Sequence, residues 1–220
     1  MNLSEVIDLL KEKSNPTYFD GMRRYGINTS NALGIRIPEL RKLAREIKKN
    51  HPLSLELWET GIHEARILAS MIDVPTEVTR LQMDQWVAGF DSWDLCDQVC
   101  GNLLVRTPYV IEKALEYSAS EKEFVKRAGF VLMAELPVHH KKIPDQQLIN
   151  FLPVIEREAW DERNFVKKAL NWALRQIGKQ NKTLNHAAID AAKRIAQQDS
   201  KSARWIANDA LAEITKRFTE

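Results

Sequence analysis

Three residues spaced four apart form the first group that could do chemistry. Trp93, Asp97 and Gly101 stand at positions i, i+4 and i+8 of a segment with helical periodicity, which predicts a single column along one helix. The column borders an apolar arc made of Leu95, Cys96, Val99, Cys100, Leu103 and Leu104. A carboxylate beside a tryptophan, with a glycine leaving room one turn on, predicts a partly buried acidic pocket. The alternative is that Asp97 is a surface or helix-capping carboxylate, as most aspartates are.

A second group lies in the segment that begins at Phe165. At 100° per residue, the apolar side chains of this segment fill one half of a helix, and Lys168, Trp172 and Arg175 fall together on the other half. An aromatic ring one turn from two cations suits a sugar-phosphate backbone with a sugar or base against the ring. The alternative is that Trp172 packs against a neighbouring helical hairpin.

An internal repeat indicates how these helices are organised. The run 124–128, Phe-Val-Lys-Arg-Ala, recurs 41 residues later at 165–169 as Phe-Val-Lys-Lys-Ala, and a fainter copy follows after another 41 residues at 206–210. A helix-only repeat of this length is typical of HEAT or armadillo proteins, in which each hairpin buries its apolar face against its neighbours. We therefore expect Phe124, Phe165 and Ile206 at equivalent inward positions of three successive hairpins.

The same repeat predicts where positive charge gathers. Arg127 occupies the repeat position of Lys168, and Arg66 occupies the same position in a divergent copy at 63–67. Successive repeats are therefore expected to present a row of cations along one groove. In the last copy the slots of Lys168 and Trp172 hold Asp209 and Glu213, as expected of a terminal capping repeat outside the groove. The alternative is a solvated helix face with no partner.

Nearly every segment shows 3.6-residue periodicity and none shows sustained alternation, so the chain is predicted to be all-α. The expected helices cover 3–13, 17–25, 38–49, 54–60, 62–73, 76–89, 93–105, 108–118, 121–136, 145–158, 162–178, 184–197 and 201–217. Pro38, Pro75 and Pro108 fall at or near helix starts, where a missing N–H costs nothing. The solenoid pattern is irregular in its first half, because the copy at 63–67 does not keep the 41-residue spacing.

Composition limits the possible functions. The chain has 44% hydrophobic and 28% charged residues with only 8 Gly and 8 Pro, typical of a helix-rich globular protein. A net charge of +2 is too small to establish a nucleic-acid partner by itself.

The sequence has no apolar run of 18 residues and starts with an acidic amphipathic segment, so we expect a cytoplasmic protein with no membrane partner. Cys96 and Cys100 lie four apart and are expected to be reduced core thiols.

Other chemistry is poorly represented. His139 and His140 lie in a Lys-rich stretch with no further ligand at metal-binding spacing. There is no Gly-rich phosphate loop, nucleophile elbow or HExxH motif. We therefore expect neither a metal nor a cofactor.

Four segments, in order and spacing, resemble the AlkD-like DNA alkylation repair family over most of the chain. They are Gly21–Asn28 with its continuation to Arg41, the stretch Ser92–Asp97, the run 124–128, and the run 169–175, Ala-Leu-Asn-Trp-Ala-Leu-Arg. The resemblance implies a single domain over 1–220, folded as a right-handed α-solenoid of HEAT-like antiparallel helical hairpins. It also implies a monofunctional glycosylase that excises positively charged alkylated purines, such as 3-methyladenine or 7-methylguanine, from double-stranded DNA in base excision repair.

The resemblance also assigns roles to residues. The catalytic aspartate of the family falls on Asp97, its tryptophan on Trp93, its second active-site tryptophan on Trp172, and a DNA-contacting arginine on Arg127. An alkylated purine is already a good leaving group, so the enzyme needs a carboxylate and aromatic faces to stabilise an oxocarbenium-like sugar, and no strong general acid. The family is thought to act without drawing the base into a deep pocket.

Further DNA contacts are expected from Lys168, Tyr25, Arg66 and Arg175, and we expect a monomer. The competing hypothesis is a non-catalytic HEAT-repeat scaffold that binds nucleic acid or protein through the same groove. A pure scaffold has no reason to place Asp97 between Trp93 and Trp172, so the enzyme hypothesis requires all three side chains to face one cavity.

Overall fold

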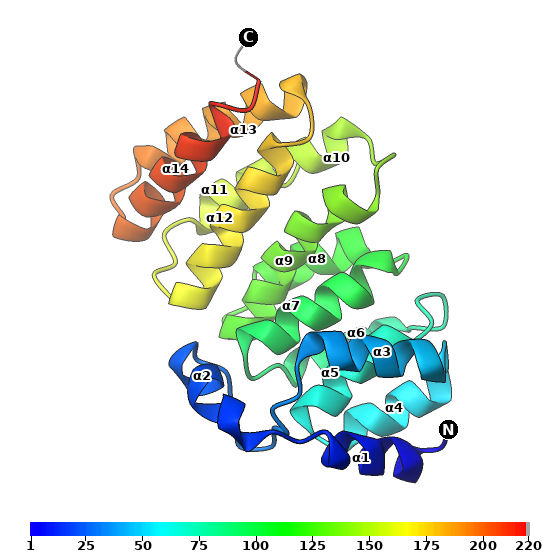
Figure 1. Ribbon diagram of the computed structural model, residues 1–220. Helices are drawn as coiled ribbons and strands as arrows, with labels where there is room; N and C mark the ends of the chain where they lie inside the picture. Colours follow the sequence, from blue (N-terminus) through cyan, green and yellow to red (C-terminus); the bar gives the residue numbers. More distant parts are fainter. Residues whose placement is uncertain (219–220) are drawn as a thin grey trace. The chain divides into compact units, whose positions relative to one another are not determined.

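The computed structural model describes residues 1–218, and within them all regular structure is helical, which confirms the predicted fold class. The chain divides into two compact units, Met1–Pro108 and Tyr109–Glu220, and each is described by itself. Figure 1 labels the helices along the chain.

The first unit contains seven α-helices and two short 3-10 turns within its described residues. They are α1 (Leu3–Glu12), η1 (Pro16–Tyr18), α2 (Phe19–Arg24), α3 (Ile37–Ile47), α4 (His51–Glu59), α5 (His63–Ile72), α6 (Arg80–Ala88), α7 (Trp93–Asn102) and η2 (Leu104–Arg106). Helix α5 packs against α3, α4 and α7 and so forms the centre of the unit. Parallel stacking of Trp58 on Trp86, with ring centroids 4.2 Å apart, joins α4 to α6.

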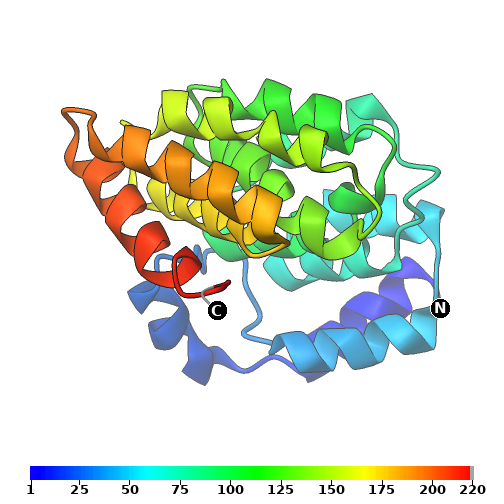
Figure 2. The ribbon, with the colours of Figure 1, turned by 90° about the horizontal axis from the view of Figure 1, so that it is seen from above.

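The second unit consists of helical hairpins in two layers. Its helices are α8 (Val110–Ser118), α9 (Glu123–His139), α10 (Asp145–Ile149), α11 (Leu152–Glu158), α12 (Asn164–Gly178), α13 (Lys182–Ala196) and α14 (Lys201–Ile214). Helices α9, α12 and α14 lie side by side in one layer, and α8, α11 and α13 pack against them and against one another in the other. Figure 2 shows α13 and α14, in orange and red, as one such hairpin. This is the arrangement that the repeat predicts.

Local signals explain several of the helix starts. Five helices are capped by a polar side chain that accepts a hydrogen bond from a backbone N–H of the first turn. The capping residues are Asn2, Asn50, Thr79, Asn181 and Ser200. Gly129 lets α9 approach α8, because a Cβ there would stand 2.5 Å from the Ser118 nitrogen.

Several expected boundaries differ from the structure by a few residues or more, and three of the differences have a clear local reason. The expected helix 145–158 is two helices, since Pro153 opens α11 within its first two residues. The expected helix 76–89 begins only at Arg80, where Thr79 caps it. Helix α9 continues past the expected end at 136 to His139, with Pro137 inside its last turn.

The repeat is confirmed for two copies and corrected for the third. Phe124 and Phe165 are each the second residue of their helix, α9 and α12, and their half-buried rings contact each other at a centroid distance of 5.7 Å. Ile206 is instead the sixth residue of α14 and is fully buried. A displacement of four residues is about one helical turn, so the apolar pattern survives it and the sequence alone does not reveal it.

Candidate active site

The column predicted on α7 is present. Trp93, Asp97 and Gly101 are all half-buried, and the six residues of the apolar arc beside them are all fully buried. Cys96 and Cys100 belong to that arc and form no disulfide. Asp97 therefore lies at the border between core and solvent, one turn from the tryptophan. Ser92 is the N-cap residue of α7, but its side chain makes no capping hydrogen bond.

The start of α7 is fastened to the segment that follows α2. The Trp93 indole Nε1 donates a hydrogen bond to the Tyr25 carbonyl at 2.8 Å. The Asn28 amide donates to the Asp91 carboxylate at 2.7 Å. The first bond fixes the orientation of the Trp93 ring, and the Tyr25 residue remains 69% exposed. Two of the predicted site residues, Tyr25 and Trp93, are thus brought together.

A buried ion pair lies beside the column and was missed in the sequence. His63 Nε2, at the start of α5, is 2.8 Å from Asp94 Oδ2, and the two side chains are 6% and 17% exposed. Burial alone would lower the pKa of His63, but the hydrogen bond to Asp94 and its charge outweigh burial and raise it. Burial likewise raises the pKa of Asp94, and the stronger opposing effect of His63 lowers it. Each partner therefore favours the charged form of the other.

Glu64, the neighbour of His63, is a structural anion. Its carboxylate is buried and accepts hydrogen bonds from the backbone N–H groups of Leu33, Gly34 and Ile35 at 2.8, 2.7 and 3.2 Å. The loop between α2 and α3 is held against α5 in this way. No spacing motif predicts this contact, because the partners are about 30 residues apart.

Arg66, which was expected in the row of cations, contacts protein groups of the first unit. Its guanidinium donates to the carbonyls of Trp58 at 3.2 Å and Gly89 at 3.4 Å, and it lies over the Trp58 ring at 4.9 Å from the centroid. Arg66 thereby satisfies carbonyl groups at the ends of α4 and α6. Its contact with DNA stays a prediction.

In the second unit, Arg127 is also turned toward protein. It is 5% exposed, and its guanidinium donates to the Phe165 carbonyl in the first turn of α12 at 2.5 Å. This contact holds α12 against α9. The equivalent Lys168 on α12 is exposed. The same position of the repeat is therefore buried in one copy and exposed to solvent in the next. DNA contact by either residue stays a prediction.

The polar face of α12 carries the remaining predicted residues. Trp172 is half-buried, one turn from the exposed Lys168. Arg175 accompanies them but forms ion pairs with Asp209, at 3.3 Å, and with Glu213, both from α14. The acidic residues of the last copy thus neutralise Arg175, whereas Lys168 is exposed one turn from Trp172.

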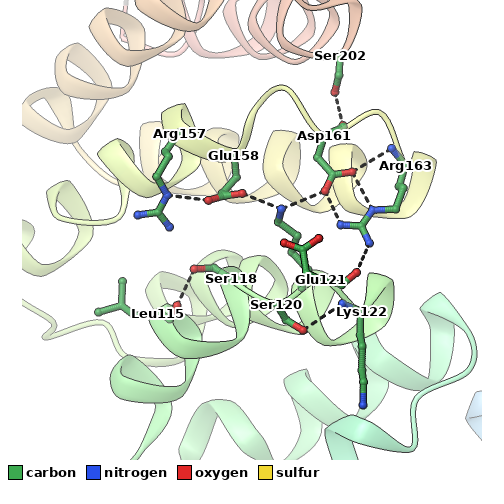
Figure 3. A network of polar contacts seen from close by, with 11 residues as sticks. Leu115, Ser118, Ser120, Glu121, Lys122, Arg157, Glu158, Asp161, Arg163 and Ser202 are labelled. Carbon is green, nitrogen blue, oxygen red and sulfur yellow. Dashed lines mark hydrogen bonds and ion pairs between the residues drawn. The ribbon is translucent and has the colours of Figure 1, made fainter.

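A buried charge network fixes the first turns of α9 and α12 (Figure 3). Lys126, the neighbour of Arg127, is 3% exposed and pairs with Glu158 at 2.7 Å and Asp161 at 3.1 Å. Arg157 pairs with Glu158, and Arg163 binds both Asp161 and the Glu121 carbonyl. Because α9, α11 and α12 meet in this network, it positions the helices that carry Arg127, Lys168 and Trp172.

In the part of the chain that the structure describes, no group of three or more His, Cys, Asp or Glu side chains is placed to hold a metal ion. Across residues 1–218, none of the helices has the length and apolar character needed to cross a membrane.

Known proteins resemble this chain over most of its length. The uncharacterized proteins Lin0241 of Listeria innocua and Lmo0209 of Listeria monocytogenes are 24% and 22% identical to it over 192 residues, which cover 86% of this chain and 84% of each relative. A solved structure has the same fold, with a TM-score of 0.80, 20% identity, and coverage of 95% of this chain and 94% of that one. It belongs to a new family of proteins related to the HEAT-like repeat DNA glycosylases with affinity for branched DNA structures.

The predicted family is tested by one further comparison. The family model described as DNA alkylation repair enzyme matches residues 6–214, which include α7, the charge network and the polar face of α12. The chain belongs to the DNA alkylation repair enzyme family.

Proposed function

We propose that this protein is a monofunctional DNA glycosylase that hydrolyses the N-glycosidic bond of positively charged alkylated purines, of the 3-methyladenine and 7-methylguanine type, in double-stranded DNA. The observation that carries the proposal is the column on α7, in which a half-buried carboxylate lies one turn from a tryptophan of fixed orientation. Membership of the DNA alkylation repair enzyme family supports the same reaction class.

The chemistry follows from the charge of the lesion. An alkylated purine leaves as a neutral base, so the barrier lies in the positive charge that develops on the deoxyribose. Asp97, at the border of the core, would stabilise that cation and orient the attacking water. A half-buried carboxylate is more effective here than a fully exposed one, because a lower local dielectric strengthens the attraction.

The aromatic residues have a matching role. The negative face of an indole ring stabilises a nearby cation, and the Trp93 ring is already held by the Tyr25 carbonyl. On the second unit, Trp172 would pack against deoxyribose and phosphate. Lys168, one helical turn from Trp172, would bind the phosphate. Tyr25 supplies an exposed ring on the first unit. We assign Arg127 and Arg66 mainly to holding the protein frame, because both guanidinium groups bind protein carbonyls.

A second candidate function is binding of branched DNA without excision. It is favoured by the structural neighbour with that affinity, and it needs the same DNA-facing residues but no catalytic carboxylate. The two functions separate in one assay, because only the first releases a free base.

The test is single-turnover release of 7-methylguanine from a methylated duplex, measured by chromatography. Asp97→Asn keeps the shape and removes the charge, and electrostatic stabilisation of this kind is worth on the order of 3 kcal/mol, so we expect release to slow by about a hundredfold. Asp8→Asn, an exposed change on α1, is the matched control and is expected to keep the wild-type rate. A folded Asp97→Asn protein with the wild-type rate would refute the role of Asp97, and wild-type protein that binds branched DNA but releases no base would favour the second function.

A further inference from the structure

The second unit contains a cavity where α9 ends. Its volume is about 410 Å³, within the range of ligand sites. The lining comes from α8, the last turn of α9, the loop that follows and α10 (Figure 1). Along α9, the distance from Lys126 to His139 is about 20 Å, at about 1.5 Å per residue. The cavity therefore lies at the opposite end of α9 from the charge network.

The floor of the cavity is apolar. Val110 and Leu136 are buried, while Ile111 and Ile143 are half-buried. Leu115 lies one turn further along α8, on the same side of the helix as Ile111, and is 42% exposed. The apolar surface thus continues from the cavity along α8. A cavity that runs on into exposed apolar surface is typical of an interaction site.

Positive charge surrounds this floor. Lys141 and Lys142 are exposed and His140 is half-buried, and all three line the cavity. Among the described lining residues there is no carboxylate. The Lys141 ammonium donates to the Pro137 carbonyl at 3.4 Å, and an ammonium group has two further N–H donors to offer. The cavity thus combines apolar surface with positive charge.

We propose that this cavity is a docking site for an acidic segment of a partner protein. One aliphatic side chain of that segment would cover the apolar floor, and its flanking carboxylates would pair with Lys141 and Lys142. Protein interfaces commonly place an apolar anchor in a pocket and surround it with polar contacts. Charge complementarity selects an acidic partner, because opposite charges speed the encounter and like charges disfavour it.

The apolar floor distinguishes this partner from DNA. A DNA backbone is bound through its phosphates by cations and N–H groups, and a phosphate placed against aliphatic side chains loses water without compensation. A leucine side chain on the same surface gains the free energy of apolar burial. Docking here does not depend on base excision, because no candidate catalytic or DNA-facing residue is among the described residues that line the cavity.

The test uses capped pentapeptides that differ in one property. Glu-Asp-Leu-Asp-Glu carries both charge and anchor, Glu-Asp-Ser-Asp-Glu lacks the anchor, and Gln-Asn-Leu-Asn-Gln lacks the charge. Binding to the full-length protein is measured by NMR titration of its backbone amides. We expect the first peptide to shift the signals of residues 110–115 and 140–147. It should bind about tenfold more tightly than the serine peptide and about fivefold more tightly than the uncharged one. Equal binding of the three peptides, shifts confined to other residues, or no binding would overturn the proposal.

Variants test the two parts of the site separately. Lys142→Glu reverses an exposed charge and should weaken binding of the acidic peptide about fivefold. Lys201→Glu, an equally exposed change at the start of α14, is the matched control and should bind normally. Ile111→Ser removes part of the floor and should weaken binding by about fivefold, while Leu211→Ser, at a half-buried position of α14, should not. Wild-type affinity in folded Lys142→Glu or folded Ile111→Ser would contradict the assignment.

Other occupants give different results in the same experiments. A hexathymidylate strand that shifts the same signals and binds more tightly than the acidic peptide would overturn the proposal in favour of DNA. Self-association of the wild-type protein in sedimentation, lost in Lys142→Glu, would overturn it in favour of a second copy of this chain. Lys142→Glu should keep the excision rate of wild type, and Asp97→Asn should keep peptide binding, so the docking site and the glycosylase proposal succeed or fail separately.

Discussion

Lys126 is the position at which the structure makes its most quantitative prediction. The ammonium group is 3% exposed and lies between Glu158 and Asp161, at 2.7 and 3.1 Å. Lys126→Met replaces it with an apolar side chain of similar length. The change removes the cation and leaves two carboxylates whose side chains are 11% and 3% exposed.

The expected loss of stability follows from what remains after the substitution. Removing one partner of a buried ion pair costs about 3–5 kcal/mol. Arg157 and Arg163 still bind the two carboxylates, so we expect the lower end, about 3 kcal/mol. For a chain of this length that corresponds to a fall in Tm of roughly 6–12 °C.

The repeat supplies a matched control for this experiment. Lys167 stands in the same slot of the next copy, but it is half-buried and lies over the Trp205 ring at 5.3 Å instead of binding a carboxylate. Lys167→Met should therefore cost less than about 1 kcal/mol. The assay is urea unfolding followed by circular dichroism, with the free energy extrapolated to water. Equal losses for the two variants, or a more stable Lys126→Met protein, would refute the account of the network.

The same network predicts a dependence of stability on pH. Burial alone raises the pKa of Glu158 and Asp161, but hydrogen bonds from Lys126 and Arg163 respectively outweigh it and lower both. Carboxyl groups with a lowered folded-state pKa stabilise the protein above their unfolded-state pKa, and this contribution is lost as the pH falls through the folded-state value. Wild type should lose more stability than Lys126→Met between about pH 5 and pH 3.

Three shorter predictions concern the other sites. Lys168→Ala should weaken binding to any DNA sequence and reduce the slope of log affinity against log salt by about 0.9, measured by titration at several salt concentrations; an unchanged slope would remove Lys168 from the interface. Arg127→Ala should lower the free energy of unfolding, because its buried guanidinium holds the Phe165 carbonyl; wild-type stability would contradict this. The pKa of the His63 imidazole, measured by NMR, should lie above its ordinary value of 6.5. The contribution of this group to stability is complete below pH 6.5 and should be lost as the pH rises through the folded-state pKa. Asp94→Asn should lower the His63 pKa, and a wild-type pKa below 6.5 would refute the ion pair.

Features that depend on local geometry could be predicted from the sequence. The all-α class, the paired copies at Phe124 and Phe165, and the column of Trp93 and Asp97 all follow from helical periodicity, which is a property of consecutive residues. The displaced third copy at Ile206 escaped detection for the same reason, since a shift of one turn preserves the periodicity.

Which charges face solvent was decided only by the tertiary structure. Arg127 and Lys168 share a repeat slot, yet one is buried against the Phe165 carbonyl and the other is exposed. The partner that fixes Arg127 lies 38 residues away in the chain, and the Asp94–His63 pair spans 31. A helix wheel gives the direction in which a side chain leaves its own helix, but a buried charge is stable only where another element supplies a donor or acceptor. The sequence therefore determined the helices and the faces of this protein, and the packing of those helices determined which polar side chains hold the frame and which remain available to a ligand.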